Sequence, residues 1–151
     1  MSLATQFNPA TYYQKYARVL GAYDSDYENF RISGSQEAAL QALLKFTAAS
    51  QIPVVFVNLP LTEDYLDPVR LEYEQEFRDY MVQLSLQQRN FVFRDLSEQW
   101  TTQYSYFSDP SHLNRYGAHA VALKLAQDAK IPWLKPQATT SRMVTDAEYG
   151  G

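Results

Sequence analysis

An aspartate and a histidine in the last third of the chain have a spacing that suits acid–base chemistry. Asp109 and His112 are separated by Pro110 and Ser111, a pair that is typical of a turn. This spacing can bring the carboxylate against one ring nitrogen of the imidazole while the other nitrogen faces a cleft. A carboxylate in that position fixes the tautomer of the histidine and stabilises its protonated form, as a general base for a serine nucleophile requires.

The same segment also has a purely structural interpretation. Asp-Pro-Ser-His is ordinary turn chemistry, in which the side chain of Asp109 caps the turn and Asn114 is the N-cap of the following helix. A metal site built from Asp109, His112 and His119 has no convincing fourth ligand, so neither a metal nor another cofactor is predicted. Spacing alone leaves the catalytic and the structural interpretations open.

The hydrophobic pattern predicts helices that alternate with two buried strands. Continuous β-branched and aromatic runs at 53–58 and 90–96 are typical of parallel strands that are covered on both faces. Asn-Pro and Asp-Pro pairs predict the starts of two helices, and Ser33 with Gln36 predicts a capping box for another. The expected helices cover residues 9–20, 36–50, 68–88 and 115 to Pro132, with an irregular loop over 21–34. This order predicts an α/β fold with reactive groups at the carboxyl ends of its strands.

Composition narrows the classes of protein to which the chain can belong. It has 151 residues, with 13 lysines and arginines against 17 aspartates and glutamates, a net charge of −4 and no cysteine. The mild acidity argues against a nucleic-acid surface, and the lack of cysteine removes disulfides, thiolate zinc sites and cysteine nucleophiles. No signal peptide and no apolar run of membrane-spanning length is recognised, and the compartment stays unknown.

Two runs carry a resemblance to a known family. The run from Asp109 to Gly117, after a strand that ends in Asp-Leu, resembles the last conserved block of the SGNH (GDSL-type) hydrolases. The run from Ile52 to Leu61 resembles their penultimate strand, especially in the envelope-associated branch of DltD-like proteins and cyanobacterial SGNH-like proteins of unknown function. The resemblance covers about residues 33–132. It implies a three-layer, flavodoxin-like parallel sheet and a Ser-His-Asp triad to which this chain contributes His112 and Asp109.

The blocks that supply the nucleophile and the oxyanion hole in that family cannot be read in residues 1–34. Ser35 follows Gly34 at a helix start and superficially matches a nucleophile turn, although an N-terminal helix cap explains it better. Asn58, at a strand exit, is a candidate oxyanion donor whose alternative role is to end the strand, and Asn114 is a further cleft candidate. The sheet is therefore expected to be incomplete, with two clear strands and four helices.

The resulting organisation has three parts. Residues 1–32 are expected to form an N-terminal helix and irregular lid, residues 33–135 the C-terminal portion of an SGNH-like domain, and residues 136–151 a disordered tail. A two-stranded sheet is marginal by itself, and the free edge of its first strand invites pairing. That edge predicts contact with a missing N-terminal half or a second copy, or cover by residues 1–32. Neither a nucleic-acid partner nor a membrane span is expected.

The resemblance implies a serine esterase or O-acyltransferase that acts on an ester or an acylated carbohydrate. Because the nucleophile and oxyanion blocks are absent, the chain by itself is expected to be inactive. One alternative is a non-catalytic interaction or carbohydrate-associated module, in which Trp100, Tyr104 and Tyr106 stack on sugar rings or on a partner. The same aromatic residues would otherwise cover the hydrophobic core. The other alternative is a truncated fragment without a function of its own.

Overall fold

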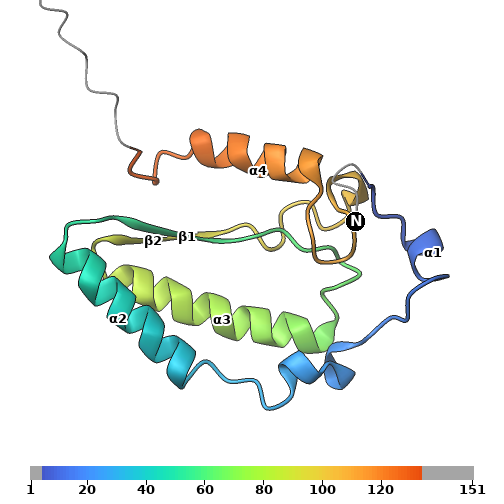
Figure 1. Cartoon of the computed structure of the whole chain (residues 1–151), viewed down its shortest axis with the longest axis horizontal. Helices are drawn as coiled ribbons and strands as arrows, with labels where there is room; N and C mark the ends of the chain where they lie inside the picture. The colour runs from blue at the N-terminus through green and yellow to red at the C-terminus, as the bar shows by residue number, and fades with distance from the viewer. Residues whose placement is uncertain (1–4, 134–151) are drawn as a thin grey trace, which may run out of the picture.

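The computed structural model describes residues 5–133 as an α/β fold, so the predicted tail 136–151 lies outside the described residues. Figure 1 shows the order of the elements along the chain. The helices are α1 (Pro9–Tyr12), α2 (Ser35–Ala49), α3 (Pro68–Gln87) and α4 (Arg115–Ala126), and the strands are β1 (Val54–Asn58) and β2 (Phe91–Asp95). Three short 3-10 helices are η1 (Gly21–Tyr23), η2 (Ser25–Tyr27) and η3 (Tyr104–Tyr106). The prediction of an α/β fold with two strands and four helices is confirmed.

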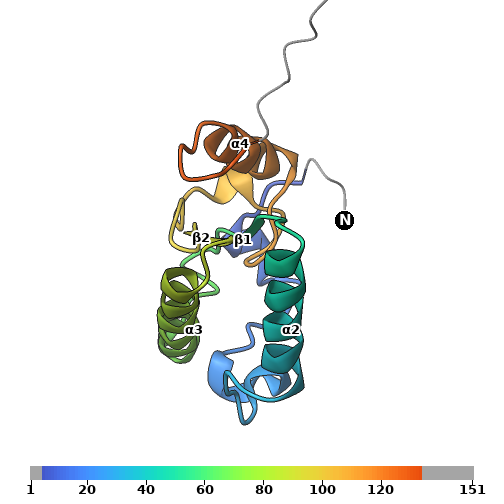
Figure 2. The ribbon, with the colours of Figure 1, turned by 90° about the vertical axis from the view of Figure 1, so that its left-hand side faces the viewer.

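The two strands form a parallel sheet that lies between two helical layers. They pair in register from Val54 opposite Phe91 to Asn58 opposite Asp95. Helix α4 covers one face of the sheet, and α2 and α3 cover the other (Figures 1 and 2). Both strands run toward the same end of the sheet, so the segments that follow them meet there.

The core lies between the sheet and the layer of α2 and α3. Leu44 of α2, Met81 and Leu84 of α3 and Phe91 of β2 are closed to solvent. Alternate residues of each strand face this layer, and the residues between them face the side of α4. Because both faces of the sheet are covered, a strand here can be a continuous apolar run. The partly buried residues packed on the core are Leu40, Val54, Phe56, Phe77, Tyr80 and Phe93.

Helix starts follow the predicted capping signals with one exception. Asn8 caps α1, and Asp67 caps α3 by accepting hydrogen bonds from the backbone N–H groups of Val69 and Arg70, at 3.1 and 3.0 Å. The predicted capping box of α2 is wrong. Gly34 occupies the N-cap in place of Ser33, with a φ of 96° that suits glycine, and it has no side chain with which to cap the helix.

Two helices are shorter than their sequence patterns predicted. The first was expected over residues 9–20 but ends at Tyr12, because tertiary bonds draw the following segment into an irregular path. The carbonyl oxygen of Val19 accepts a hydrogen bond from Arg70, and the N–H of Gly21 donates to Asp67 at 2.7 Å. The last helix was expected to reach Pro132 but ends at Ala126, and Asp128 just beyond it forms an ion pair with Arg94 of β2 at 2.5 Å.

The N-terminal segment packs at the carboxyl ends of the strands (Figure 1). Phe7 is buried there, and its N–H donates to the carbonyl oxygen of Phe107 at 2.8 Å. Its ring also meets the ring of Tyr104 edge-on at 5.4 Å. The start of the chain is thus tied to the loop after β2, whereas Tyr27 and Phe30 stack on Tyr73 of α3, and residues 5–32 add no strand to the sheet.

Candidate functional site

Asp109 and His112 form a pair in the loop between β2 and α4. The Nδ1 atom of His112 lies 2.9 Å from Oδ1 and 3.0 Å from Oδ2 of Asp109. The Asp109 side chain is 12% exposed, whereas that of His112 is 75% exposed. One edge of the imidazole is thus held by a nearly buried carboxylate, and the rest of the ring is open to solvent.

The same carboxylate also caps the turn, so the two interpretations of Asp109 describe one arrangement. Its Oδ1 atom accepts hydrogen bonds from the backbone N–H groups of Ser111 and His112, both at 2.9 Å. An ionised carboxylate can only accept, so a neutral His112 must carry its proton on Nδ1. The lone pair of Nε2 is then free to take a proton, which is the state that a general base needs.

The loop after β1 anchors the turn that carries this pair. The backbone N–H and the Oγ1 hydroxyl of Thr62 both donate to the carbonyl oxygen of Pro110, at 3.1 and 2.7 Å. Thr62 is fully buried, and within the turn the N–H of Ser108 donates to the carbonyl oxygen of His112 at 2.8 Å. The segments that follow both strands are therefore tied together at the end of the sheet, as expected for an α/β fold.

Asn114 is a buried structural residue beside the pair. Its Oδ1 atom accepts from the N–H groups of Tyr116 and Gly117, at 2.9 and 3.1 Å, and so caps α4. Its Nδ2 group lies within 3.1 Å of three carbonyl oxygens, those of Thr5, Ser105 and Phe107. With all of its polar atoms engaged, Asn114 holds the loop in place, and it does not line the cavity at His112.

A cavity of about 250 Å³ lies next to His112, and part of its wall comes from the N-terminal segment. Burial and the negative charge of Asp109 raise the pKa of the Tyr12 phenol, so this hydroxyl stays protonated beside the carboxylate. No residue of this segment was among the predicted site residues, although its many tyrosines were the available signal. The residues that line the cavity with the pair include Tyr12, Tyr13, Arg18, Asp64, Tyr65 and Pro110.

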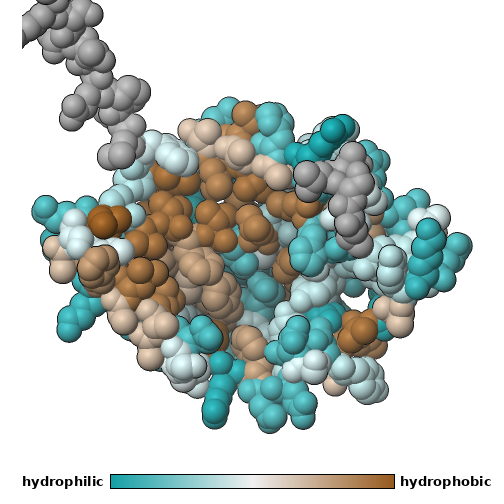
Figure 3. Space-filling view, in the orientation of Figure 1, coloured by the Kyte–Doolittle hydropathy of each residue, from teal (hydrophilic) through white to brown (hydrophobic). Residues whose placement is uncertain are grey.

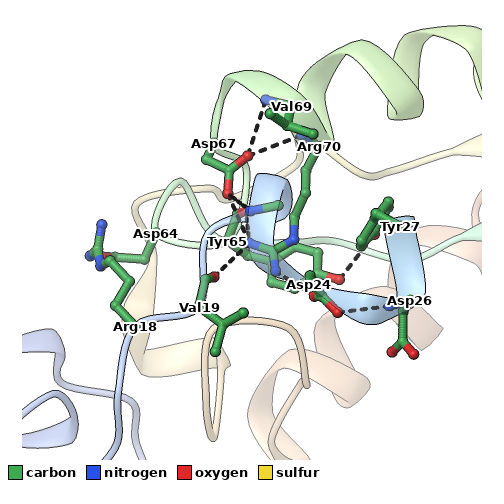
Figure 4. A network of polar contacts seen from close by, with 11 residues as sticks. Arg18, Val19, Asp24, Asp26, Tyr27, Asp64, Tyr65, Asp67, Val69 and Arg70 are labelled. Carbon is green, nitrogen blue, oxygen red and sulfur yellow. Dashed lines mark hydrogen bonds and ion pairs between the residues drawn. The ribbon is translucent and has the colours of Figure 1, made fainter. Parts of the chain in front are cut away.

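A buried arginine fastens that wall to the body of the fold (Figure 4). Arg70 of α3 is 3% exposed and pairs with Asp24 at 2.6 Å and with Asp67 at 2.9 Å. It also donates to the carbonyl oxygen of Val19 at 3.1 Å, and its guanidinium carbon stands 4.3 Å from the ring centre of Tyr65. Residues 19–24 are thereby held against the loop that precedes α3.

Hydrogen bonds keep both carboxylates of this network in their charged form. The hydrogen bond from Arg70, followed by that from the N–H of Asp26, lowers the pKa of Asp24. Burial acts to raise the pKa of Asp67, but hydrogen bonds from the backbone of Gly21 and Arg70 outweigh it and leave that pKa lowered. Both aspartates therefore stay ionised beside the buried guanidinium.

Two of the predicted site residues lie apart from the pair. The Nδ2 group of Asn58 donates to Glu74 at 3.0 Å and to Asp95 at 3.2 Å, so its amide protons serve the contact between the strand ends and α3. Ser35 is the first residue of α2, and the structure assigns no strand to residues 28–34 before it. Neither Asn58 nor Ser35 lines the cavity at His112.

The aromatic residues after β2 pack against neighbouring rings. Trp100 meets Tyr106 edge-on at 5.1 Å. The hydroxyl of Tyr104 donates to Glu63 at 2.7 Å, and its ring meets Phe7. These contacts hold the loop to the N-terminal segment, and Trp100, Tyr104 and Tyr106 are not part of the cavity wall at His112.

The described residues contain neither a metal-binding cluster nor a membrane-spanning helix. Within residues 5–133, no group of three or more His, Cys, Asp or Glu side chains is placed to hold a metal ion. None of the helices in that range combines the length and the apolar character that crossing a membrane requires.

Comparison with known proteins identifies the family. No curated protein and no solved structure matches the chain. The family described as DltD protein matches residues 6–127, a range that extends the resemblance seen in the sequence to include the N-terminal wall of the cavity. A match over this much of the chain shows that it belongs to the DltD protein family, an SGNH-like, hydrolase-related family.

Proposed function

We propose that this chain supplies the acid–base pair of an SGNH-like acyl-transfer site, with His112 as the general base and Asp109 as the residue that positions it. The observation that carries this proposal is the asymmetric setting of His112, whose Nδ1 edge meets a nearly buried carboxylate while the ring remains exposed beside a cavity. If His112 served only the turn, the hydrogen bond from its backbone N–H to Asp109 would suffice. The additional contact between the carboxylate and the ring nitrogen is what a general base requires.

The chemistry follows from the free Nε2 atom. As a serine Oγ attacks the carbonyl carbon of an ester, Nε2 of His112 takes the hydroxyl proton, and it returns that proton to the alkoxide that leaves. Water or a second hydroxyl then cleaves the acyl-serine with the same histidine as base, which gives hydrolysis or acyl transfer. Asp109 stays ionised throughout, accepts a hydrogen bond from Nδ1 and stabilises the imidazolium.

The serine comes from a segment other than the described residues. Among residues 5–133, the hydroxyl within hydrogen-bonding distance of the His112 ring is that of Ser111, 3.2 Å from Nδ1, the nitrogen that Asp109 already holds. The expected substrate class is an ester or an acylated carbohydrate. The chain by itself is expected to leave a serine-reactive phosphonate probe unreacted, and stoichiometric labelling that His112→Ala abolishes would contradict this.

The tautomer of His112 tests the proposal directly. In a long-range ¹H–¹⁵N spectrum above the titration range, His112 is expected in the Nδ1–H form, whereas free histidine favours the Nε2–H form. Asp109→Asn should lose that preference, and exposed His119 serves as the internal reference. An Nε2–H tautomer for His112 in the unmodified chain would refute the role assigned to Asp109.

A further inference from the structure

A run of backbone hydrogen bonds joins the loop after β1 to the segment between β2 and α4. The N–H groups of three successive residues donate to three carbonyl oxygens, from Leu61 to Ser97 at 2.9 Å, from Thr62 to Pro110 at 3.1 Å and from Glu63 to Thr101 at 3.0 Å. The middle bond reaches the turn that carries Asp109 and His112. Thr62 is fully buried, and its hydroxyl donates to the same oxygen of Pro110 at 2.7 Å. Two donors of one buried residue therefore hold a single carbonyl oxygen of the turn.

The ring of His112 depends on hydrogen bonds for its orientation. On the face that Figure 3 shows, the hydrophobic area lies over the sheet and α2, whereas the surface toward the carboxyl ends of the strands is mostly hydrophilic. The His112 side chain is 75% exposed. An exposed side chain changes rotamer rapidly unless a contact holds it, so the ring keeps one orientation only if the Asp109 carboxylate is itself held in place.

A single peptide unit links Thr62 to that carboxylate. The carbonyl group of Pro110 that Thr62 holds belongs to the same peptide unit as the N–H of Ser111. A trans peptide unit is planar, and its C=O and N–H groups point in opposite directions. Fixing the oxygen therefore fixes the direction of the N–H, which donates to Oδ1 of Asp109 at 2.9 Å. The same carboxylate oxygen lies 2.9 Å from Nδ1 of His112.

Thr62 also fixes part of the cavity wall. Its carbonyl oxygen accepts hydrogen bonds from the N–H groups of Tyr65 and Leu66, at 3.0 and 3.1 Å, which closes a turn just before α3. Tyr65 lines the cavity at His112, and Leu66 is buried. One residue thus sets the position of the Asp109–His112 pair relative to a tyrosine of the wall.

We propose that Thr62 is a positioning residue for His112. Its hydroxyl holds the Pro110 carbonyl, which aims the N–H of Ser111 at Asp109 and so keeps the carboxylate against Nδ1 of the imidazole. This inference rests on the proposed function, in which a proton held on Nδ1 leaves Nε2 free to act as the base.

The tautomer of His112 in variants of Thr62 tests this proposal. A methyl group stays about 3.3–3.6 Å from a carbonyl oxygen, so Thr62→Val removes the hydroxyl and also pushes the Pro110 carbonyl outward by about 0.6 Å or more. In ¹⁵N spectra of the full chain above the titration range of the ring, the ratio of the Nδ1–H to the Nε2–H form should fall about tenfold or more. That factor corresponds to the loss of a hydrogen bond to a charged group. Thr62→Ser keeps the hydroxyl and should keep the ratio within about threefold.

A second buried threonine provides the matched control. Thr47 of α2 is buried, and its hydroxyl likewise donates to a carbonyl oxygen, that of Leu43 at 3.0 Å. Thr47 does not line the cavity at His112. Thr47→Val should therefore destabilise the chain without changing the tautomer ratio of His112. An equal change in that ratio would mean that the ratio reports general loss of stability, and the proposal would be wrong.

Amide exchange tests the intermediate step in the native chain. The N–H of Ser111 is expected to exchange at least about tenfold more slowly than a free amide, because Asp109 accepts it. An unprotected Ser111 amide would overturn the proposal without any variant. If Thr62→Val does not fold, Thr62→Ala removes the hydroxyl without placing a methyl group against the carbonyl, and the same fall in the tautomer ratio is expected.

The role of Thr62 and the proposed function can fail separately. A native chain in the Nδ1–H form whose ratio persists in folded Thr62→Val or Thr62→Ala would refute the role of Thr62 and leave the function of His112 intact. Loss of the ratio in folded Thr62→Ser would also refute it, because the hydroxyl is still present. An Nε2–H form of His112 in the native chain would instead refute the proposed function.

Discussion

Replacing Arg70 by methionine tests the buried network that holds the cavity wall. Methionine has a similar length and keeps most of the packing, so the substitution removes chiefly the charge and its hydrogen bonds. The change breaks the ion pairs with Asp24 and Asp67 and the bond to the carbonyl oxygen of Val19. Removing one partner of a buried ion pair typically costs about 3–5 kcal/mol, because a charge is left without compensation.

Two features of the structure reduce that figure. The side chains of Asp24 and Asp67 retain 20% and 13% exposure, so water solvates part of each carboxylate. Asp67 also keeps its bonds from the backbone N–H groups of Gly21, Val69 and residue 70. We therefore expect Arg70→Met to lower the free energy of unfolding by about 2–4 kcal/mol at pH 7, and the melting temperature by roughly 5–15 °C.

Urea unfolding at two pH values checks both the size and the origin of the effect. Because folding lowers the pKa values of Asp24 and Asp67, their contribution is complete above the ordinary aspartate pKa of about 4 and is lost as the pH falls below it. The difference between the native chain and Arg70→Met should thus shrink at about pH 2.5. Arg89→Met, at an exposed arginine, is the matched control and should change stability by less than about 0.5 kcal/mol. A loss below about 1 kcal/mol at pH 7, or one that is equal at both pH values, would refute this account of the network.

Four further substitutions test the packing of the fold, each by urea unfolding. Asn114→Ala removes a helix cap and leaves buried carbonyl groups without a donor, so it should cost about 3 kcal/mol, and a loss below about 1 kcal/mol would contradict its anchoring role. Gly117→Ala should destabilise by more than about 2 kcal/mol although alanine favours helices, since its Cβ atom would lie 2.2 Å from the carbonyl oxygen of Tyr106; a stabilised variant would disprove that contact. Leu44→Ala should cost about 2–5 kcal/mol, whereas Phe46→Ala on the same helix should cost less than about 1 kcal/mol, and equal losses would mean that Phe46 is covered in the isolated chain.

Helix starts were largely predictable because they depend on neighbouring residues. Three predicted N-caps are confirmed, at Asn8, Asp67 and Asn114. In each, the side chain accepts a hydrogen bond from a backbone N–H two or three positions ahead. The end of α1 was not predictable from periodicity. The residues after Tyr12 have an apolar face, but their bonds to Asp67 and Arg70, on a distant part of the chain, outweigh a marginal helix.

The same distinction separates the residues proposed for the site. Asn58 was a candidate oxyanion donor because it ends a strand, yet its amide is engaged by Glu74 and Asp95, neither of which is near it in the sequence. The role of Asn114 as a cap followed from the sequence, whereas its bonds to Thr5 and Phe107 needed the folded chain. The role of a candidate site residue therefore depends on its hydrogen-bond partners in the folded chain, and its position in a strand or helix does not specify those partners.

The sequence by itself predicted the Asp109–His112 contact, because residues three apart across a turn can bring the carboxylate against the imidazole, although Thr62 of a distant loop also anchors that turn. Tertiary structure decided what surrounds that contact. The cavity beside His112 depends on an N-terminal wall held by Arg70, 46 residues beyond Asp24. Long-range ion pairs and the packing of layers cannot be recognised from neighbouring residues in the sequence, since they join segments that come together only when the chain folds.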